Sequence, residues 1–219
     1  MPIRTSSLRS LGAFLNVFAI ESFMDELAEC AGADPVAFRL AHLTDPRAVR
    51  VIEEVAEFSG WAGRPQQEGT GYGIGYARYK GLAGYCAAVA EVEAEDDVRV
   101  RRLWLAVDVG TVINPNGLVN QVEGGAVQST SWAIRERVTF DRAKITSLSW
   151  DTYPVLRFTE VPRVAVRIVA SGRPETGAGE VAQGPVAAAI GNALAQAAGV
   201  RVRDLPLTRE QVIRAIEDD

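Results

Sequence analysis

The spacing of apolar residues changes once along this chain, near Trp61, and the change limits the fold to one that combines helices with a sheet. From residue 16 to residue 31, apolar side chains recur every three or four positions, which predicts an amphipathic helix. The expected buried stripe of this helix is Val17, Ile20, Met24 and Leu27. Two Asp-Pro pairs, at residues 34 and 45, predict further helix starts, because aspartate caps a helix and proline fits its first turn. We therefore expect residues 1–62 to form a helical layer.

After Trp61 the period approaches two, which predicts strands. The expected strands span residues 73–80, 84–94, 98–109 and 164–170, with a short hairpin of 138–140 and 145–147. The expected helices span 16–31, 36–43, 47–58, 118–133, 185–198 and 208–216. The predicted fold class is α/β (α+β), a mixed sheet with packed helices, and the sheet is expected within residues 63–219.

Charge and hydropathy exclude several classes of partner. The chain has 23 Lys and Arg against 28 Asp and Glu, and a net charge of -5 does not attract a phosphate backbone. We expect no nucleic-acid partner. Apolar runs stay shorter than the roughly 18 residues of a membrane span, and the first residues lack the apolar core of a secretory signal. We expect no membrane span and a cytoplasmic protein, or a periplasmic one if a partner carries the export signal.

The sequence does not contain the residue sets that several common kinds of active or binding site require. The single histidine, His42, has no second ligand at zinc spacing, so we expect no metal-ligating set. The sequence has no Gly-x-Ser-x-Gly motif, which would present the nucleophile of a serine hydrolase. Alternating glycines at residues 71, 73 and 75 precede a strand rather than a helix, which argues against a dinucleotide site. The acidic run at residues 91–97 is better interpreted as a solvated strand face than as a calcium loop. Acid–base chemistry must therefore use carboxylates.

Two segments have the composition of a binding or catalytic site. In the first, a strand ending near Val109 leads through a tight turn to a helix with a small-sided face, which places Gln121 near backbone amides. This geometry suits a polar or anionic ligand, and it suits a packed strand-loop-helix unit equally well. In the second, glycines flank Glu180 just before a helix. Glu180 is either a proton acceptor in a pocket or a residue that caps the helix dipole.

Three motifs occur in a recognisable order. They are RTSSLRSLGAFLNVFAIESFMDELA at Arg4–Ala28, VDVGTVINPNGLVNQVEGGAVQ at Val107–Gln128, and GAGEVAQGPVAAAIGNALAQAAGVRVRDLP at Gly177–Pro206. With them the chain resembles the carboxy-terminal part of the molybdenum-cofactor subunit of the xanthine dehydrogenase and aldehyde oxidase family. The resemblance is greatest to isoquinoline 1-oxidoreductase-like beta subunits.

The resemblance implies an oxidoreductase that hydroxylates a carbon of a heterocycle or an aldehyde, with oxygen from water. It implies a molybdenum-molybdopterin cofactor, in the cytosine dinucleotide form, held without protein side chains on the metal. Glu180 matches the base that accepts a proton, Gln121 a cofactor-contacting glutamine, and Gly179 a glycine beside the metal.

The loop from residue 6 to residue 12 matches the segment that lines the cofactor and the substrate funnel. Ser6 stands where many relatives have arginine, and Leu8 where purine hydroxylases have a stacking phenylalanine. These departures argue against a purine-clamping site.

The implied partners are the remaining molybdopterin-subunit portion and a subunit that carries iron-sulfur clusters. A Gly-x-Gly-Gln-Gly type segment of that family is not visible in these residues, so we expect the chain to form one wall of the site. The alternative is a noncatalytic remnant or assembly module that keeps the fold without bound cofactor.

Overall fold

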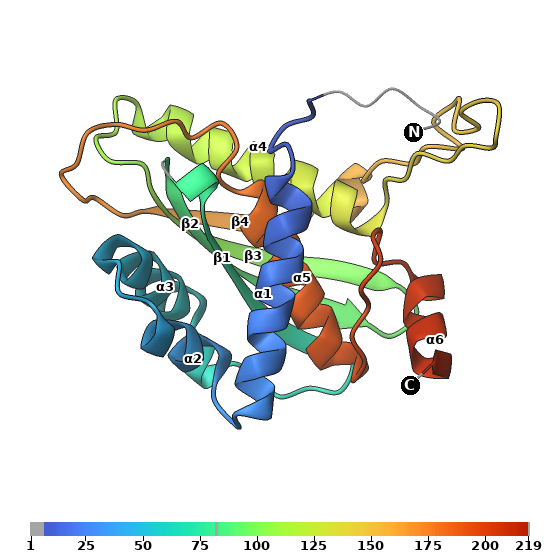
Figure 1. Ribbon diagram of the computed structural model, residues 1–219, viewed down its shortest axis with the longest axis horizontal. Coiled ribbons are helices and arrows are strands. Elements are labelled where there is room, and N and C mark those ends of the chain that lie inside the picture. The colour runs from blue at the N-terminus through green and yellow to red at the C-terminus, as the bar shows by residue number, and fades with distance from the viewer. Residues whose placement is uncertain (1–6, 82, 219) are drawn as a thin grey trace.

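A computed structural model describes residues 7–81 and 83–218, which form six α-helices around a four-stranded sheet (Figure 1). The helices are α1 (Ala13–Cys30), α2 (Pro35–His42), α3 (Pro46–Ser59), α4 (Pro115–Ile134), α5 (Gln183–Ala198) and α6 (Arg209–Asp218). The strands are β1 (Thr70–Arg78), β2 (Tyr85–Ala94), β3 (Val98–Asp108) and β4 (Arg163–Ile168). No helix among these described residues is long and apolar enough to cross a membrane.

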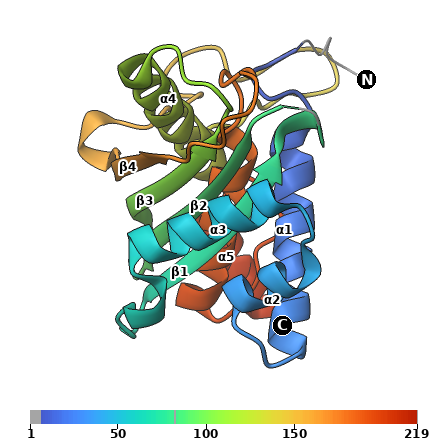
Figure 2. The same cartoon turned by 90° about the vertical axis from the view of Figure 1, so that its left-hand side faces the viewer.

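The sheet is mixed, as the sequence predicted. Its order is β1-β2-β3-β4, with antiparallel pairing from β1 to β3 and parallel pairing between β3 and β4. Helix α5 packs against β1 and β2 on one face, and α3 packs against β2 and β3 on the other (Figure 2). Helix α1 packs on α5, so the helices of the first 62 residues lie on both sides of the sheet. The division of the chain at residue 62 stays a prediction.

The local signals for helix starts are confirmed. The Asp34 carboxylate accepts hydrogen bonds from the backbone nitrogens of Val36 and Ala37, at 2.9 and 3.1 Å, and caps α2. Asp45 caps α3 in the same way through the backbone nitrogen of Arg47, at 3.0 Å. The predicted hairpin at 138–147 is reduced to one bridge, between Phe140 and Ile145. The segment that contains it projects from the body between α4 and β4 (Figure 1).

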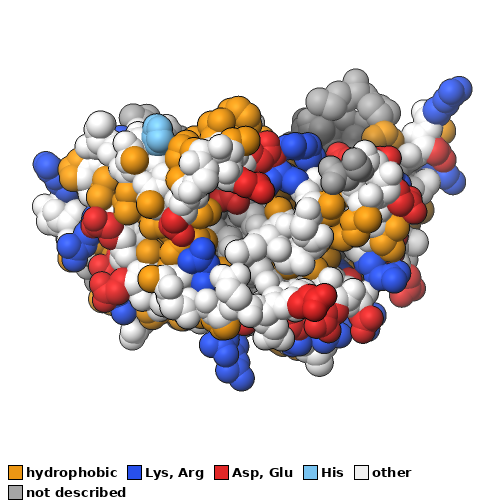
Figure 3. Space-filling view, turned by 90° about the horizontal axis from the view of Figure 1, so that it is seen from below, with side chains coloured by type: hydrophobic (Ala, Val, Ile, Leu, Met, Phe, Trp, Pro, Cys, Tyr) orange, Lys and Arg blue, Asp and Glu red, His pale blue; other side chains and the backbone are white. Residues whose placement is uncertain are grey.

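The expected buried stripe of α1 is wrong at two of its four residues, because Val17 and Met24 are half-buried but Ile20 and Leu27 are exposed. Ile20 is 59% exposed and Leu27 is 38% exposed, whereas the buried residues of this helix are Phe18, Glu21, Ser22 and Ala28. The reason is a charged network that hydropathy cannot anticipate: Nε of Arg39 donates to Glu21 at 2.8 Å and Nη1 donates to Asp25 at 3.2 Å. On the face of the molecule that lies at the bottom of Figure 1, hydrophobic side chains and charges of both signs surround a hollow (Figure 3).

The alternating glycines of β1 bring the backbones of a strand and a helix together. A Cβ at Gly71 or Gly73 would lie 2.0 Å or 2.1 Å from backbone atoms of Ala193 in α5, and one at Gly75 would lie 2.4 Å from the Pro185 oxygen. Because real Cβ atoms do not approach so closely, only glycine fits at these positions. The three glycines are therefore a packing device, in agreement with the rejection of a dinucleotide site.

Candidate functional site

Two loops, one after β3 and one before α5, meet at the same end of the sheet. Backbone hydrogen bonds join them, from the Thr111 nitrogen to the Arg173 oxygen and from the Thr176 nitrogen to the Val109 oxygen, both at 2.8 Å. The second loop carries Glu180, and α4, which follows the first, carries Gln121. The two segments that the sequence singled out are therefore neighbours in space.

Asp108 anchors this end of the sheet. Its carboxylate accepts bonds from Nε and Nη2 of Arg47, both at 2.7 Å, from the Gly110 nitrogen at 2.9 Å, and from Oγ of Ser171 at 2.7 Å. Burial alone would raise the pKa of Asp108, but these four bonds outweigh burial and lower it. An ionised Asp108 thus ties α3 and both loops to the end of β3.

Glu180 is held by both of its carboxylate oxygens. Tyr79, which follows β1, donates its hydroxyl to Oε2 at 2.5 Å, and the Ser10 backbone nitrogen donates to Oε1 at 2.7 Å. These bonds, first that of Tyr79, lower the pKa of Glu180 despite the opposing effect of burial. Burial and the bond to Glu180 raise the pKa of Tyr79 to about 12. At neutral pH the pair is therefore a carboxylate held by a neutral phenol.

The Gly179 carbonyl is the point where three segments converge. It accepts a bond from Nε of Arg9 at 2.6 Å and one from Nε2 of Gln121 at 3.2 Å. Arg9 also donates to Oε1 of Gln128 at 3.0 Å, so it links the N-terminal segment to α4. Gln121 and Gly179, which the resemblance assigned to one cofactor, thus contact each other.

The N-terminal segment is strained where it reaches Glu180. Ser10 and Leu11 have φ values of 75° and 51°, in the left-handed region that L-residues other than Asn and Asp rarely adopt. The Ser10 hydroxyl oxygen is also buried with no hydrogen-bond partner in the described part of the chain. Strain and an unsatisfied polar atom beside a charged group are typical of functional sites.

A concavity of about 460 Å³ opens beside Gln121 and Gly179, and Val109, Asn114 and Thr176 contribute to its walls. A Cβ added at Gly179 would meet no atom within 4 Å, so the backbone there is accessible to another molecule. Of the other expected site residues, Leu8 is 73% exposed at the start of the N-terminal segment. Ser6 lies outside the described residues.

Three residues of this site were not expected from the sequence, namely Arg9, Ser10 and Tyr79. Tyr79 lies 101 residues before Glu180, and no local pattern links the two positions. The one available signal was the position of Arg9 and Ser10 inside the first motif, which the resemblance connected with the cofactor.

Comparisons with known proteins identify the family of the chain. The family model for the molybdopterin cofactor-binding domain matches residues 17–162. One nicotinate dehydrogenase subunit, from Pseudomonas putida, is 40% identical over 98% of this chain and 20% of its own length. The beta subunit of isoquinoline 1-oxidoreductase from Brevundimonas diminuta is 38% identical over 91% of this chain and 26% of its own length. The chain therefore spans about a fifth to a quarter of these curated relatives.

Solved structures show the same fold. The aldehyde oxidoreductase from Desulfovibrio gigas superposes with a TM-score of 0.81 at 16% identity, over 98% of this chain and 42% of that one. Quinoline 2-oxidoreductase from Pseudomonas putida 86 superposes with a TM-score of 0.56 at 27% identity, over 62% of this chain and 18% of that one. Because the family model covers more than half of the sequence, the chain belongs to the molybdopterin cofactor-binding domain family.

Proposed function

We propose that this chain forms one wall of the active site of a molybdenum hydroxylase, and that Glu180 is its proton acceptor. The observation that carries the proposal is the double hydrogen bond to the Glu180 carboxylate, beside the Gln121–Gly179 contact. The names of the relatives favour a nitrogen heterocycle as substrate, since nicotinate and isoquinoline are both of this class. An aldehyde is the second substrate class.

The residues present fit a molybdopterin cofactor. That cofactor is anionic, and the site offers donors in the Arg9 guanidinium and the Gln121 amide, together with the exposed backbone at Gly179. The unpartnered Ser10 hydroxyl supplies one further polar group at the same place. When bound, the cofactor supplies the two-electron oxidation and activates water. We propose the cytosine dinucleotide form, on the resemblance to the isoquinoline branch.

The protein side chains then have distinct tasks. Glu180 remains ionised because Tyr79 and the Ser10 nitrogen stabilise its charge, and each oxygen keeps a second lone pair to accept a proton. The same two bonds fix the direction of the carboxylate, which proton transfer requires. Tyr79 is therefore a positioning residue, since it acts through Glu180. We propose that the remaining molybdopterin-subunit portion and an iron-sulfur subunit complete the enzyme.

Cofactor analysis of the complete protein tests this proposal. We expect molybdenum and pterin to co-purify with it, and Gln121→Ala to retain less of both, because the amide that meets the Gly179 carbonyl is lost. Asn120→Ala serves as the control, because it removes a neighbouring side-chain amide from the same helix and should leave the cofactor content unchanged. Complete protein without molybdenum and pterin would instead favour a noncatalytic module that keeps the fold.

Removing the Tyr79 hydroxyl should change the pH dependence of turnover. In Tyr79→Phe the strongest stabiliser of the Glu180 charge is lost, so the pKa of Glu180 rises and the acid limb of kcat/KM moves to higher pH. We expect kcat to fall by about five- to tenfold, the rate equivalent of one hydrogen bond. Infrared spectroscopy measures this shift directly: the carboxylate band of Glu180 is identified by its absence in Glu180→Gln. In Tyr79→Phe this band should titrate at higher pH than in the wild type.

The chain contains a matched control for this experiment. Tyr153 donates its hydroxyl to Oε2 of Glu136 at 2.6 Å, and its pKa is also raised to about 12, by burial and by that bond. Tyr153→Phe therefore removes the same kind of bond elsewhere and should leave the pH profile unchanged. A Tyr79→Phe profile that overlays that of the wild type would contradict the positioning role.

A further inference from the structure

The first part of β3 has an open edge. Strand β4 begins at Arg163, opposite Arg102, so within residues 7–81 and 83–218 the segment Val98–Val100 pairs with β2 alone, and Arg101 is the extra residue of a bulge in that pairing. An open edge presents backbone donors and acceptors to which an extended peptide can add as a further strand. This edge lies apart from the Glu180 site, because Glu180 is near the opposite end of β3, where Asp108 lies.

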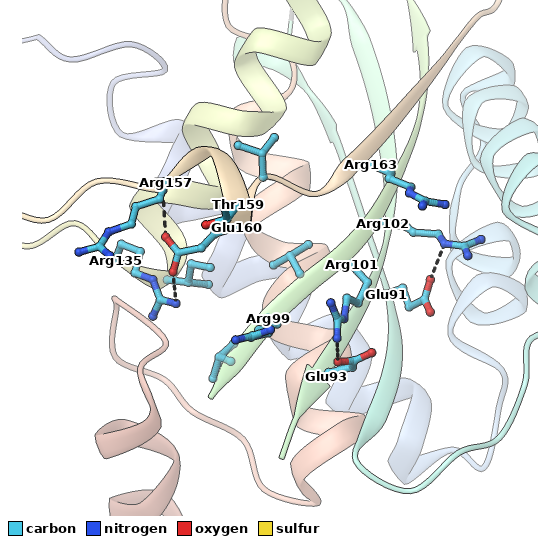
Figure 4. A pocket seen from close by; sticks show the side chains of 14 residues that line it. Glu91, Glu93, Arg99, Arg101, Arg102, Arg135, Arg157, Thr159, Glu160 and Arg163 are labelled. Carbon is cyan, nitrogen blue, oxygen red and sulfur yellow. Dashed lines mark hydrogen bonds and ion pairs between the residues drawn. The ribbon is translucent and has the colours of Figure 1, made fainter. Parts of the chain in front are cut away.

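A groove of about 570 Å³ runs beside this edge (Figure 4). One wall comes from β2 and β3, and the other comes from the end of α4 and the segment 157–163. Six arginines contribute to its lining, namely Arg99, Arg101, Arg102, Arg135, Arg157 and Arg163. The acidic groups among the lining residues are Glu91, Glu93 and Glu160. The groove is therefore locally cationic in a chain whose net charge is -5.

The glutamates of the groove each pair with one arginine. Arg101 meets Glu93 at 2.6 Å, Arg102 meets Glu91 at 3.4 Å, and Arg135 meets Glu160 at 2.8 Å.

The other three arginines of the groove, at positions 99, 157 and 163, have no carboxylate within 4.0 Å in the described part of the chain. All three are exposed, and Figure 4 shows Arg157 on the wall opposite the β3 arginines, with its guanidinium directed away from them. The groove therefore has unmatched positive charge at Arg99 and at Arg163.

An exposed aromatic side chain follows Arg157 in the sequence. Phe158 is 99% exposed and lies in sequence between Arg157 and Thr159, which both line the groove. A large aromatic side chain fully in water, next to unpaired arginines, is typical of residues that become buried against a protein partner.

We propose that the groove binds an extended acidic segment of a partner polypeptide, which adds to β3 at Val98–Val100 and places its carboxylates against Arg99 and Arg163. A peptide uses both features of the groove, the open backbone edge and the cations, whereas a nucleotide or free anion uses only the cations. A long polyanion such as RNA is disfavoured by the net charge of the chain.

Site-specific photo-crosslinking in the complete protein complex tests this proposal. A photoreactive residue replaces Thr159, which lines the groove and is exposed, and a control replaces Ala143, which is exposed in the projecting segment. We expect position 159 to crosslink to one continuous polypeptide segment rich in Asp and Glu. No crosslink above the control, a crosslink to nucleic acid, or a crosslinked segment without acidic residues would overturn the proposal.

Charge reversal in the same crosslinking system tests the role of the arginines. Arg99→Glu combined with Arg163→Glu should lower the crosslink yield at position 159 by at least about tenfold, and the corresponding glutamine pair should give an intermediate yield. Arg142→Glu changes the same charge at an exposed position outside the groove and should have no effect. Equal yields in all variants would show that the arginines do not recognise the partner. None of these readouts depends on Glu180 or on a cofactor.

Discussion

Replacing Glu180 with glutamine in the complete protein should lower turnover by at least about 100-fold, while the molybdenum content stays close to that of the wild type. Glutamine has nearly the same shape, and its side-chain oxygen can still accept the bond from the Ser10 nitrogen. It cannot accept a proton, however, and that ability is the one the proposed mechanism requires. Loss of turnover with retained cofactor would thus separate catalysis from cofactor binding. The measurement is steady-state turnover normalised to bound molybdenum.

Glu136→Gln is the matched control for this substitution. Glu136 also accepts hydrogen bonds from a tyrosine, Tyr153, and from the Ser131 hydroxyl, but none of these residues touches the Gln121–Gly179 contact. We expect Glu136→Gln to keep turnover near the wild-type value. Turnover of Glu180→Gln equal to that of this control would remove Glu180 from the mechanism, whatever the effect of Tyr79→Phe.

The second large effect is expected from Arg39→Met, which should lower the free energy of unfolding by about 3–5 kcal/mol. Arg39 is 2% exposed, and it donates to the Glu21 carboxylate at 2.8 Å and to the Glu21 and Pro35 carbonyls, both at 3.0 Å. Methionine preserves apolar packing and helix propensity but leaves a buried carboxylate without its cation. Urea unfolding followed by tryptophan fluorescence measures the change.

This loss should depend on pH in a defined direction. Burial raises the pKa of Glu21 in the native protein, and Arg39 opposes that rise. Without Arg39 the folded-state pKa rises further, so folding favours protonated Glu21 and the destabilisation grows as the pH increases through that pKa. We therefore expect a smaller loss at acidic pH than at pH 8. A loss that is constant with pH would assign the effect to packing alone.

Arg203→Met is the control for Arg39→Met, because it removes an arginine from an exposed ion pair instead of a buried one. Arg203 is 70% exposed and pairs with Glu26 at 2.6 Å. Because exposed ion pairs contribute only about 0–1 kcal/mol, this substitution should change the unfolding midpoint little. Equal losses for Arg39→Met and Arg203→Met would contradict the importance of burial.

Local patterns were sufficient for most of the secondary structure. The period-two segments became β1, β2 and β3, and the Asp-Pro pairs became the starts of α2 and α3, because each signal acts within a few residues. The buried face of α1 could not be predicted in this way. It depends on Arg39, which is 18 residues away from Glu21 in the sequence. The ion pair with Arg39 lets the polar side of α1 that carries Glu21 face the interior.

The candidate site shows the same limit. Gln121 and Gly179 were selected from motifs, and the fold brings them to 3.2 Å from each other. Tyr79 was missed because its hydrogen bond to Glu180 depends on how α5 packs on β1. A short stretch of sequence does not show how two distant elements pack. The roles of Glu180, Gln121 and Gly179 stay predictions until the substitutions above are measured.

The glycine stripe of β1 has a consequence for the accuracy of the site. Tyr79 follows β1 directly, and Glu180 lies three residues before α5, so the two elements that meet through Gly71, Gly73 and Gly75 also carry the two partners of the 2.5 Å bond. Main-chain atoms have no rotamers, and a contact between them leaves little room for sliding or thermal adjustment. The distance between the Tyr79 phenol and the Glu180 carboxylate is thus set by a contact between two backbones. We expect mutations elsewhere in the core to change this distance less than they would change one set by packed side chains.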